Sequence, residues 1–574
     1  MQWATTTPAD LVLATTTAPA DLRLDANALD YALVAFYFVL VLGIGLVARR
    51  SISSSLDFLL SGRSLPAWVT GLAFISANLG AIELIGMTAN GAQYGIPTAH
   101  YYWVGAIPAM VFLGIVMMPF YYGSKARSVP EFLALRFNRT TQRVQAVVFA
   151  LASLLIAGVN LYALGLVLEA LLGWPQALAI PVSALVVLSY TFLGGLSAAI
   201  YNEVLQFFVI LALLIPITVA GLARVGGYAG LVERVTAGPG GPEQLSAWPG
   251  TSLTEIANPF LSVFGIVFGL GFVLSFGYWT TNFAEVQRAL SAKSLNAGRM
   301  TPIIGAFPKT LVPLVIVIPG MVAGVLIPGI VTLKAGGDTE FTYNNSLSLL
   351  MGEVLPNGVL GVAIAGLLAA FMAGMAANVS SFNTVFTYDI WQDWVRPGEE
   401  DEYYLKVGRA VTVGGCVIAI FTAYLAGSFS NLMDYIQALA SFFNAPLFAI
   451  FIFGLFYKKM TGTAGWTGLL AGVAAAVLVD LLVRADVIVV SAQAGSFLGA
   501  SAAFVVGCLV SFIVSQFTPG KTDEELSGLT WATSTREQRG GGAVAAEDAG
   551  WYRNPMIMGM AVLALTLVLY IIWW

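Results

Sequence analysis

Two segments of the chain combine polar side chains and glycines inside long apolar runs. Residues 67–91 read AWVTGLAFISANLGAIELIGMTANG, and Glu83 lies near the middle of this run. Residues 259–285 carry four glycines and turn polar from Tyr278 and Trp279 onward. A carboxylate at the centre of a bilayer costs about 2.5–3.5 kcal/mol on insertion scales, so we expect Glu83 to face a cavity or a partner. Carboxylates, amides and aromatic rings in such segments are typical of a pocket for a small polar molecule.

The composition indicates that these segments lie in a lipid bilayer. Of 574 residues, 58% are hydrophobic and 10% charged, and the mean hydropathy is +0.83. Soluble domains carry about 25% charged residues. The net charge of −5 argues against a nucleic-acid partner, which requires a basic surface. One histidine and two cysteines in apolar runs disfavour a histidine metal site, a catalytic triad or a disulfide framework, so we expect neither an enzyme nor a cofactor.

Apolar runs long enough to cross about 30 Å of hydrocarbon recur from residue 31 to residue 574. They predict an all-α polytopic membrane protein with about fourteen transmembrane helices. The predicted spans are 31–48, 67–91, 101–120, 144–172, 176–194, 203–222, 259–285, 303–326, 358–388, 406–427, 432–456, 465–483, 492–515 and 555–574.

The basic residues set the predicted orientation, because they favour the cytoplasmic side. With an extracellular N-terminus and fourteen spans, 20 basic residues fall inside, 5 fall outside, and Lys309 lies within a span. We therefore expect a multi-pass protein of the plasma (inner) membrane with both termini extracellular.

The two interrupted spans, 67–91 and 259–285, are each the first of five consecutive predicted spans. An odd number of spans inverts the second group, and paired interrupted spans in inverted repeats indicate a transporter with its site near the membrane midplane. Small residues that only allow tight helix packing are the simpler alternative. The predicted organisation is an extracellular disordered tail (1–30), a leading helix (31–48), a first five-helix repeat (67–222), an extracellular loop (223–258), a second, inverted repeat (259–456), two accessory helices (465–515), a cytoplasmic loop (516–554) and a C-terminal helix (555–574).

Seven short motifs, in order along the chain, resemble the solute:sodium symporter family, most closely its sodium/galactose branch. The motifs are SGRSLPAW (61–68), ANLGAIELIGM (77–87), SVPEFLALRFN (128–138), LGGLSAAIYNEVLQ (193–206), VQRALSAKS (286–294), FTYDIW (386–391) and FGLFYKK (453–459). The resemblance implies a LeuT-type five-plus-five inverted-repeat core with broken first and sixth core helices. It also implies sodium-coupled symport of a sugar or similar small polar solute by alternating access.

The resemblance also implies a solute site between the first, second, sixth, seventh and tenth core helices. Three positions depart from the galactose branch: Glu83 replaces a glutamine, Tyr102 an acidic residue and Ser275 an asparagine. An amine-bearing solute at Glu83 is therefore an alternative to a sugar. Tyr278 matches the inner gate, and Asn160 matches a polar position beside that gate. The expected solute-binding residues are Asn78, Glu83, Tyr101, Tyr102, Ser275, Tyr278, Trp279, Lys309 and Gln437.

The resemblance implies sodium as the coupling ion, but two positions of the expected sodium site depart from the family. Sodium binds about five or six hard oxygens, and where the family supplies two hydroxyls this chain has Ala373 and Gly374. Proton-coupled or uncoupled transport, with Glu83 or Asp434 carrying the proton, is the alternative, and a transport-derived sensor is a lesser one. Glu203 matches an inner acidic position on the ion path. The family's sodium-site positions correspond to Ser76, Leu79, Ala370, Ala373 and Gly374.

We also expect Asp389 to anchor the inner end of its span and His100 to lie at the outer membrane interface.

Overall fold

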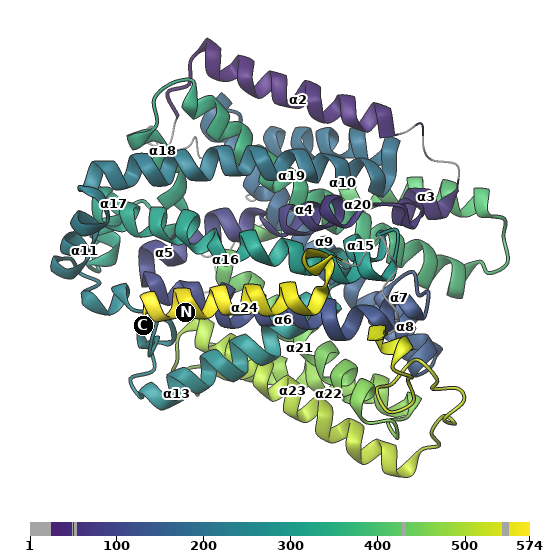
Figure 1. The fold of residues 1–574 in the computed structure, drawn as a ribbon. Coiled ribbons are helices and arrows are strands. Elements are labelled where there is room, and N and C mark those ends of the chain that lie inside the picture. The colour runs from purple at the N-terminus through teal and green to yellow at the C-terminus, as the bar shows by residue number, and fades with distance from the viewer. Residues whose placement is uncertain (1–23, 49, 51–53, 428–431, 542–549) are drawn as a thin grey trace.

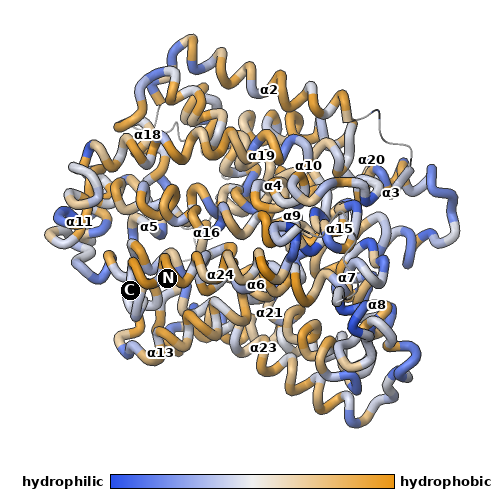
Figure 2. The backbone as a smooth tube through the Cα atoms, viewed as in Figure 1, coloured by the Kyte–Doolittle hydropathy of each residue, from blue (hydrophilic) through white to orange (hydrophobic). Residues whose placement is uncertain are grey.

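The computed structural model describes residues 24–48, 50, 54–427, 432–541 and 550–574, and most of the predicted N-terminal tail lies outside these ranges. In the described part every regular element is a helix, and Leu65 and Ala292 form an isolated parallel bridge. The helices run mostly along one direction (Figure 1). Apolar residues follow their lengths and hydrophilic residues gather at their two ends (Figure 2), as expected for a membrane-spanning bundle. The prediction of an all-α membrane protein is confirmed.

Twelve described helices are long and apolar enough to cross a membrane, and one further pair of bent helices passes the same test together. Helix α10 (Gln176–Val225) has 50 residues, about 75 Å at 1.5 Å per residue, which is too long for one crossing. Its chain turns at Gly195, where φ is +51°. A Cβ there would lie 2.4 Å from the carbonyl oxygen of Phe58, so the turn requires glycine. Because α10 covers the predicted spans 176–194 and 203–222, the structure agrees with about fourteen crossings.

The elements follow the predicted order along the chain. Up to the end of the predicted first repeat they are α2 (Ala28–Ala48), α3 (Ser55–Leu60), η3 (Ser61–Arg63), α4 (Ala67–Asn78), η4 (Ile82–Met87), α5 (Thr88–Tyr94), η5 (Ile96–Ala99), η6 (Tyr101–Ala106), α6 (Ile107–Phe112), η7 (Leu113–Met117), α7 (Met118–Gly123), α8 (Val129–Arg136), α9 (Arg139–Leu172) and α10. The next connection contains α11 (Gly227–Ala237), η8 (Pro242–Leu245) and α12 (Thr251–Thr254).

The second half continues in the same way. Its elements are α13 (Pro259–Phe264), η9 (Gly265–Ser275), α14 (Phe276–Thr281), α15 (Phe283–Leu290), α16 (Leu295–Leu326), α17 (Pro328–Lys334), η10 (Tyr343–Asn345), α18 (Ser346–Val354), α19 (Val359–Val385), η11 (Phe386–Val395), α20 (Asp401–Ala426) and α21 (Leu432–Phe456). After them come α22 (Gly462–Arg484), α23 (Ala492–Phe517), η12 (Glu537–Gly541), η14 (Trp551–Arg553) and α24 (Pro555–Ile572).

The first core helix is broken where the polar motif predicts. Helix α4 ends at Asn78, and the chain bends by 60° before continuing as η4 and α5. Leu79 at the bend has φ −75° and ψ 49°, outside helical geometry. Gly80 follows it, and the second half starts with Glu83 in the first turn of η4. The break therefore exposes backbone groups beside a carboxylate in the middle of the bundle.

The sixth core helix is interrupted differently. Over η9 it winds as a π-helix, and the span Pro259–Thr281 then ends at Asn282, whose ψ of 111° is extended. The Asn282 side chain accepts from Ala284 N–H (3.1 Å) and starts α15. The predicted span 259–285 is thus four residues shorter in the structure, and Glu285 belongs to the separate helix α15.

The segment before the first core helix and the segment after the sixth lie side by side. Leu65 N–H donates to the Ser291 carbonyl (3.1 Å), and Lys293 N–H donates to the Leu65 carbonyl (2.8 Å). At the other end of the bundle, Ala247 N–H donates to the Trp573 carbonyl (2.7 Å). His100 is fully buried there between the Tyr570 hydroxyl (2.8 Å) and the Ala247 carbonyl (2.7 Å). The expectation of an interfacial His100 is therefore wrong, because helix α24 covers it.

Candidate functional site

A cavity of about 90 Å³ lies at the break in the first core helix. Eight of the nine predicted solute-binding residues line it, from α4, η4, η6, η9, α14, α16 and α21. The predicted residues in the lining are Asn78, Glu83, Tyr101, Ser275, Tyr278, Trp279, Lys309 and Gln437. Apolar side chains from the same helices complete the wall, among them Ile82, Leu274 and Met433.

A larger cavity of about 420 Å³ lies between α2, α9, α10 and α19. Its lining is almost entirely apolar, and residues such as Leu42 and Leu185 there are exposed on the outer surface of the bundle. A lipid tail suits such a surface better than a polar solute does. The smaller, polar cavity is the candidate site.

Lys309 and Glu83 form a buried ion pair at the polar end of this cavity. Lys309 Nζ lies 2.6 Å from Glu83 Oε1, and the two side chains are 1% and 9% exposed. Tyr102 does not line the cavity, but its hydroxyl donates to Glu83 Oε2 (2.6 Å). Lys309 also lies 4.8 Å from the ring centroid of Tyr102 and 5.5 Å from that of Trp279. The aromatic faces and the carboxylate together stabilise the buried ammonium group.

A chain of hydrogen bonds continues from Lys309 toward the expected gate residue. Lys309 Nζ donates to Asn78 Oδ1. Asn78 Nδ2 donates to the Tyr278 hydroxyl (3.1 Å), which in turn donates to Glu285 Oε1 (3.0 Å). Tyr278 therefore couples the cavity to α15. The sequence marked Glu285 as one of the polar residues that interrupt the span 259–285 but gave it no role in the site, because its distance from Tyr278 along the chain does not reveal their contact.

The remaining predicted residues differ in what they offer a solute. The hydroxyl of Tyr101 donates to Gln493 Oε1 of α23 (2.5 Å), so this side chain presents mainly its ring to the cavity. Trp279 stacks on Phe74 with ring centroids 5.6 Å apart, which fixes its orientation. Gln437 contributes an amide, and the residue as a whole is 8% exposed. Asp434 belongs to the residues whose side chains the structure does not describe.

The expected sodium-site positions lie around the same break. Ser76, Leu79, Ala370 and Ala373 are fully buried, and the Ser76 hydroxyl has no hydrogen-bond partner among the described residues. Ala373 offers no side-chain oxygen. Sodium at these positions would depend on backbone carbonyls and on hydroxyl or amide oxygens close to the break.

Asn160 occupies the space that glycines leave open next to these positions. Its Oδ1 accepts from Ala81 N–H (3.0 Å), directly after the break. A Cβ on Gly80 would lie 2.5 Å from this oxygen, and one on Gly374 would lie 2.4 Å from it. The absence of a hydroxyl at position 374 thus has a physical reason, since any side chain there would collide with the Asn160 amide. Asn160 holds the break itself rather than the ring of Tyr278.

Polar residues further along α19 have internal partners. Asn378 Nδ2 donates to the Gly374 carbonyl (2.8 Å), and the Ser381 hydroxyl donates to the Asn378 carbonyl (3.0 Å). Asn383 Nδ2 donates to the Thr412 hydroxyl (2.9 Å). These hydrogen bonds use donor groups of the three side chains and hold them along α19 and against α20.

Glu203, expected on an inner ion path, lies in a second buried ion pair. Arg288 of α15 donates to both of its carboxylate oxygens, and both side chains are fully buried. Arg288 also donates to the Ala284 carbonyl (2.7 Å). The pair joins α10 to α15, and in this structure Glu203 does not face an open path.

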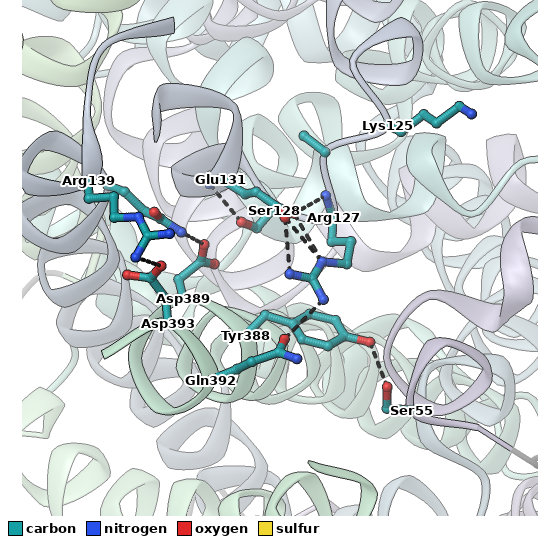
Figure 3. A network of polar contacts seen from close by, with 12 residues as sticks. Ser55, Lys125, Arg127, Ser128, Glu131, Arg139, Tyr388, Asp389, Gln392 and Asp393 are labelled. Atoms are coloured by element: carbon teal, nitrogen blue, oxygen red, sulfur yellow. Dashed lines mark hydrogen bonds and ion pairs between the residues drawn. The ribbon is translucent and has the colours of Figure 1, made fainter. Parts of the chain in front are cut away.

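A polar network joins α3, α8, α9 and η11 (Figure 3). Arg127 forms an ion pair with Glu131 (3.0 Å), donates to Gln392 Oε1 (3.0 Å) and lies 4.1 Å from the ring centroid of Tyr388. Asp389 Oδ1 accepts from Gln142 Nε2 (2.7 Å). This geometry agrees with an anchoring role for Asp389 and gives it no contact with the cavity.

Comparisons with known proteins agree with the geometry. The profile described as "Sodium:solute symporter family" matches residues 58–472. The chain is 30% identical over 463 residues to the "Sodium/glucose cotransporter" of Vibrio parahaemolyticus, covering 78% of this chain and 84% of that protein. It is 30% identical over 493 residues to "Sodium/glucose cotransporter 4" of Homo sapiens, covering 81% and 71%.

Among solved structures, a substrate-bound, outward-open "Na+-coupled sialic acid symporter" superposes with a TM-score of 0.72 over 86% of this chain and 99% of that one, at 18% identity. This likeness shows the shared fold. Together with the family profile and the relatives, it shows that the helical bundle has a known transporter fold. The chain belongs to the sodium:solute symporter family.

Proposed function

We propose that the protein imports a small polar solute, a sugar or a similar polyol, together with sodium. The polar cavity between the two broken core helices is the solute site, and transport proceeds by alternating access across the plasma membrane. Both termini lie on the extracellular side. Sodium:solute symport is the activity that the family membership supports.

The observation that carries this proposal is the polar cavity at the break, with the Lys309–Glu83 pair at one end. Asn78, Ser275 and Gln437 add amide and hydroxyl groups, and Trp279 adds a ring face. Hydroxyl groups of a polyol can donate to the carboxylate and the amide oxygens and accept from the ammonium and the amide nitrogens, while its C–H face stacks on an aromatic ring. The relatives named sodium/glucose cotransporters support the same solute class.

The ion pair also favours an uncharged solute over an amine. A solute ammonium group bound at Glu83 would lie beside Lys309 Nζ, which is 2.6 Å from the same carboxylate. Two cations this close repel in a poorly hydrated site. An amine-bearing solute would therefore have to displace Lys309, whereas a polyol can bind with the pair intact.

The decisive experiment is uptake into proteoliposomes of a panel of radiolabelled sugars, polyols, amino acids and carboxylates. Separate sodium and proton gradients are imposed on matched vesicles, with protein-free liposomes as the control. We expect saturable uptake of an uncharged polyol that an inward sodium gradient accelerates. Uptake of no panel member, or uptake that sodium leaves unchanged, would contradict the proposal.

A further inference from the structure

Three carboxylates and two cations are buried near the inner side of the cavity. Lys309 pairs with Glu83, and Arg288 pairs with Glu203. Glu285 is only 2% exposed, and it has no cation within ion-pair distance among the described residues. A buried carboxylate without a paired cation is costly, and the cost falls when it binds a proton or a cation.

The contacts of Glu285 link it to the gate. Its Oε1 accepts from the Tyr278 hydroxyl (3.0 Å), and its Oε2 has no hydrogen-bond partner among the described residues. Through Tyr278 and Asn78 it is connected to Lys309 in the solute cavity. The carboxylate therefore contacts directly the side chain that the family resemblance implies as the inner gate.

The charged groups that act on Glu285 come from a few elements. Arg288 of α15 and Lys309 of α16 favour its ionised form, and Glu203 of α10 opposes it. The helices α4 and α19, which also pack on α15, carry no charged side chain. Helix α7 contributes Tyr121, whose hydroxyl donates to the Thr280 carbonyl (2.8 Å).

We propose that Glu285 is a proton-binding site that controls the inner gate through Tyr278. The inference rests on the proposed transport function. A proton from the aqueous phase adds to a carboxylate oxygen and yields the neutral acid, and no other bond forms or breaks. The ionised carboxylate holds the Tyr278 hydroxyl by a charge-assisted hydrogen bond, and the neutral acid holds it less strongly. Protonation therefore favours release of Tyr278 and opening toward the cytoplasm.

The pKa of Glu285 agrees with control of Tyr278 by protonation. Burial raises the pKa of Glu285 to about 7, so its charge changes near physiological pH. Hydrogen bonds to charged groups exceed neutral ones by roughly 1 kcal/mol. The rate of solute exchange in the wild type is thus expected to rise about fivefold as the pH falls through about 7.

The test measures solute exchange in proteoliposomes at fixed sodium, with equal pH on both sides, from about pH 5.5 to about pH 8.5. Glu285→Gln is expected to exchange at the acid rate of the wild type at every pH, because its amide oxygen accepts from Tyr278 without a charge. Tyr278→Phe should likewise lose the pH dependence, whereas Glu285→Asp should keep it. The matched control is Glu353→Gln, which removes an exposed carboxylate paired with Arg224 and should retain the wild-type profile.

A second measurement needs no transport. Infrared difference spectra of the purified protein across the same pH range should show a buried carboxylic-acid band that is missing in Glu285→Gln. A wild-type pH profile retained by Glu285→Gln or by Tyr278→Phe, or an infrared band unchanged in Glu285→Gln, would overturn the inference. If no solute is exchanged at any pH, the proposed transport function fails, and the infrared band still decides the protonation of Glu285.

Discussion

Lys309 is the residue on which the polar contacts of the cavity converge. It contacts Glu83, Asn78 and two aromatic rings, and its side chain is 1% exposed. Because it holds an ammonium group away from water, each of these contacts offsets part of the desolvation cost. The same group is the strongest hydrogen-bond donor that the cavity offers a solute.

Replacing Lys309 by Met should both destabilise the protein and abolish solute binding. The change leaves Glu83 as an unpaired buried carboxylate, which costs about 3–5 kcal/mol. Adding Glu83→Gln should restore most of the thermal stability but not the binding, since the donor is still missing. Thermal unfolding of the purified protein and equilibrium solute binding measure the two effects.

The control for Lys309→Met is Lys406→Met, which breaks an exposed ion pair with Glu402. Such a surface pair contributes at most about 1 kcal/mol. If Lys309→Met loses as little thermal stability as the control does, the Lys309–Glu83 ion pair is not buried in the purified protein. Unchanged solute affinity in Lys309→Met would place the solute elsewhere.

The broken first core helix depends on a close fit of two glycines around one amide. Asn160 Oδ1 accepts from Ala81 N–H, and neither Gly80 nor Gly374 has room for a Cβ beside it. The amide thus satisfies a backbone donor that the break leaves without a helical partner. Its carbonyl dipole also presents an oxygen at the place where the family's sodium site is expected.

Gly80→Ala should therefore be destabilising by about 1–3 kcal/mol, because it displaces the Asn160 amide and strands the Ala81 N–H. The same substitution should cost less in an Asn160→Ala background, where the collision no longer exists. Thermal unfolding of the four variants of this double-mutant cycle gives the coupling between the two sites. Additive effects would show that the amide does not hold the break.

The helical elements were far more predictable than the contacts between them. Hydropathy and the basic residues were enough to predict the order of the spans, and the polar motif at 76–83 predicted the break. The turn at Gly195 and the π-helical winding of η9 depend on packing against other helices, which periodicity does not reveal. The polar motifs alone predicted that Glu83 faces a cavity or a partner, and the family resemblance supplied the full set of cavity residues. The contact of Glu285 with Tyr278 was not predicted, because it spans the turn at Asn282.

Considered as a whole, the molecule holds α15, close to the candidate solute cavity, by several buried contacts. On one side α15 is tied to α10 by the buried Arg288–Glu203 pair and to α14 by Glu285. Gln287 Nε2 also donates to the Leu59 carbonyl (2.9 Å) and to the Thr384 hydroxyl (2.8 Å). We expect these contacts of α15 to separate when the inner side of the cavity opens.

The orientation of the bundle in the membrane can be tested directly. The 20 basic residues on the expected inner side predict that both termini are extracellular. The bond from Ala247 N–H to the Trp573 carbonyl places the loop 223–258 and the end of α24 on one side of the bundle. Single cysteines are introduced at Thr15, Gly240 and Glu524 after Cys416 and Cys508 are replaced by Ala. We expect a membrane-impermeant maleimide to label positions 15 and 240 in intact cells and position 524 only after permeabilisation. Labelling of position 15 from the cytoplasm alone would invert the topology and, with it, the side toward which Tyr278 and Glu285 open.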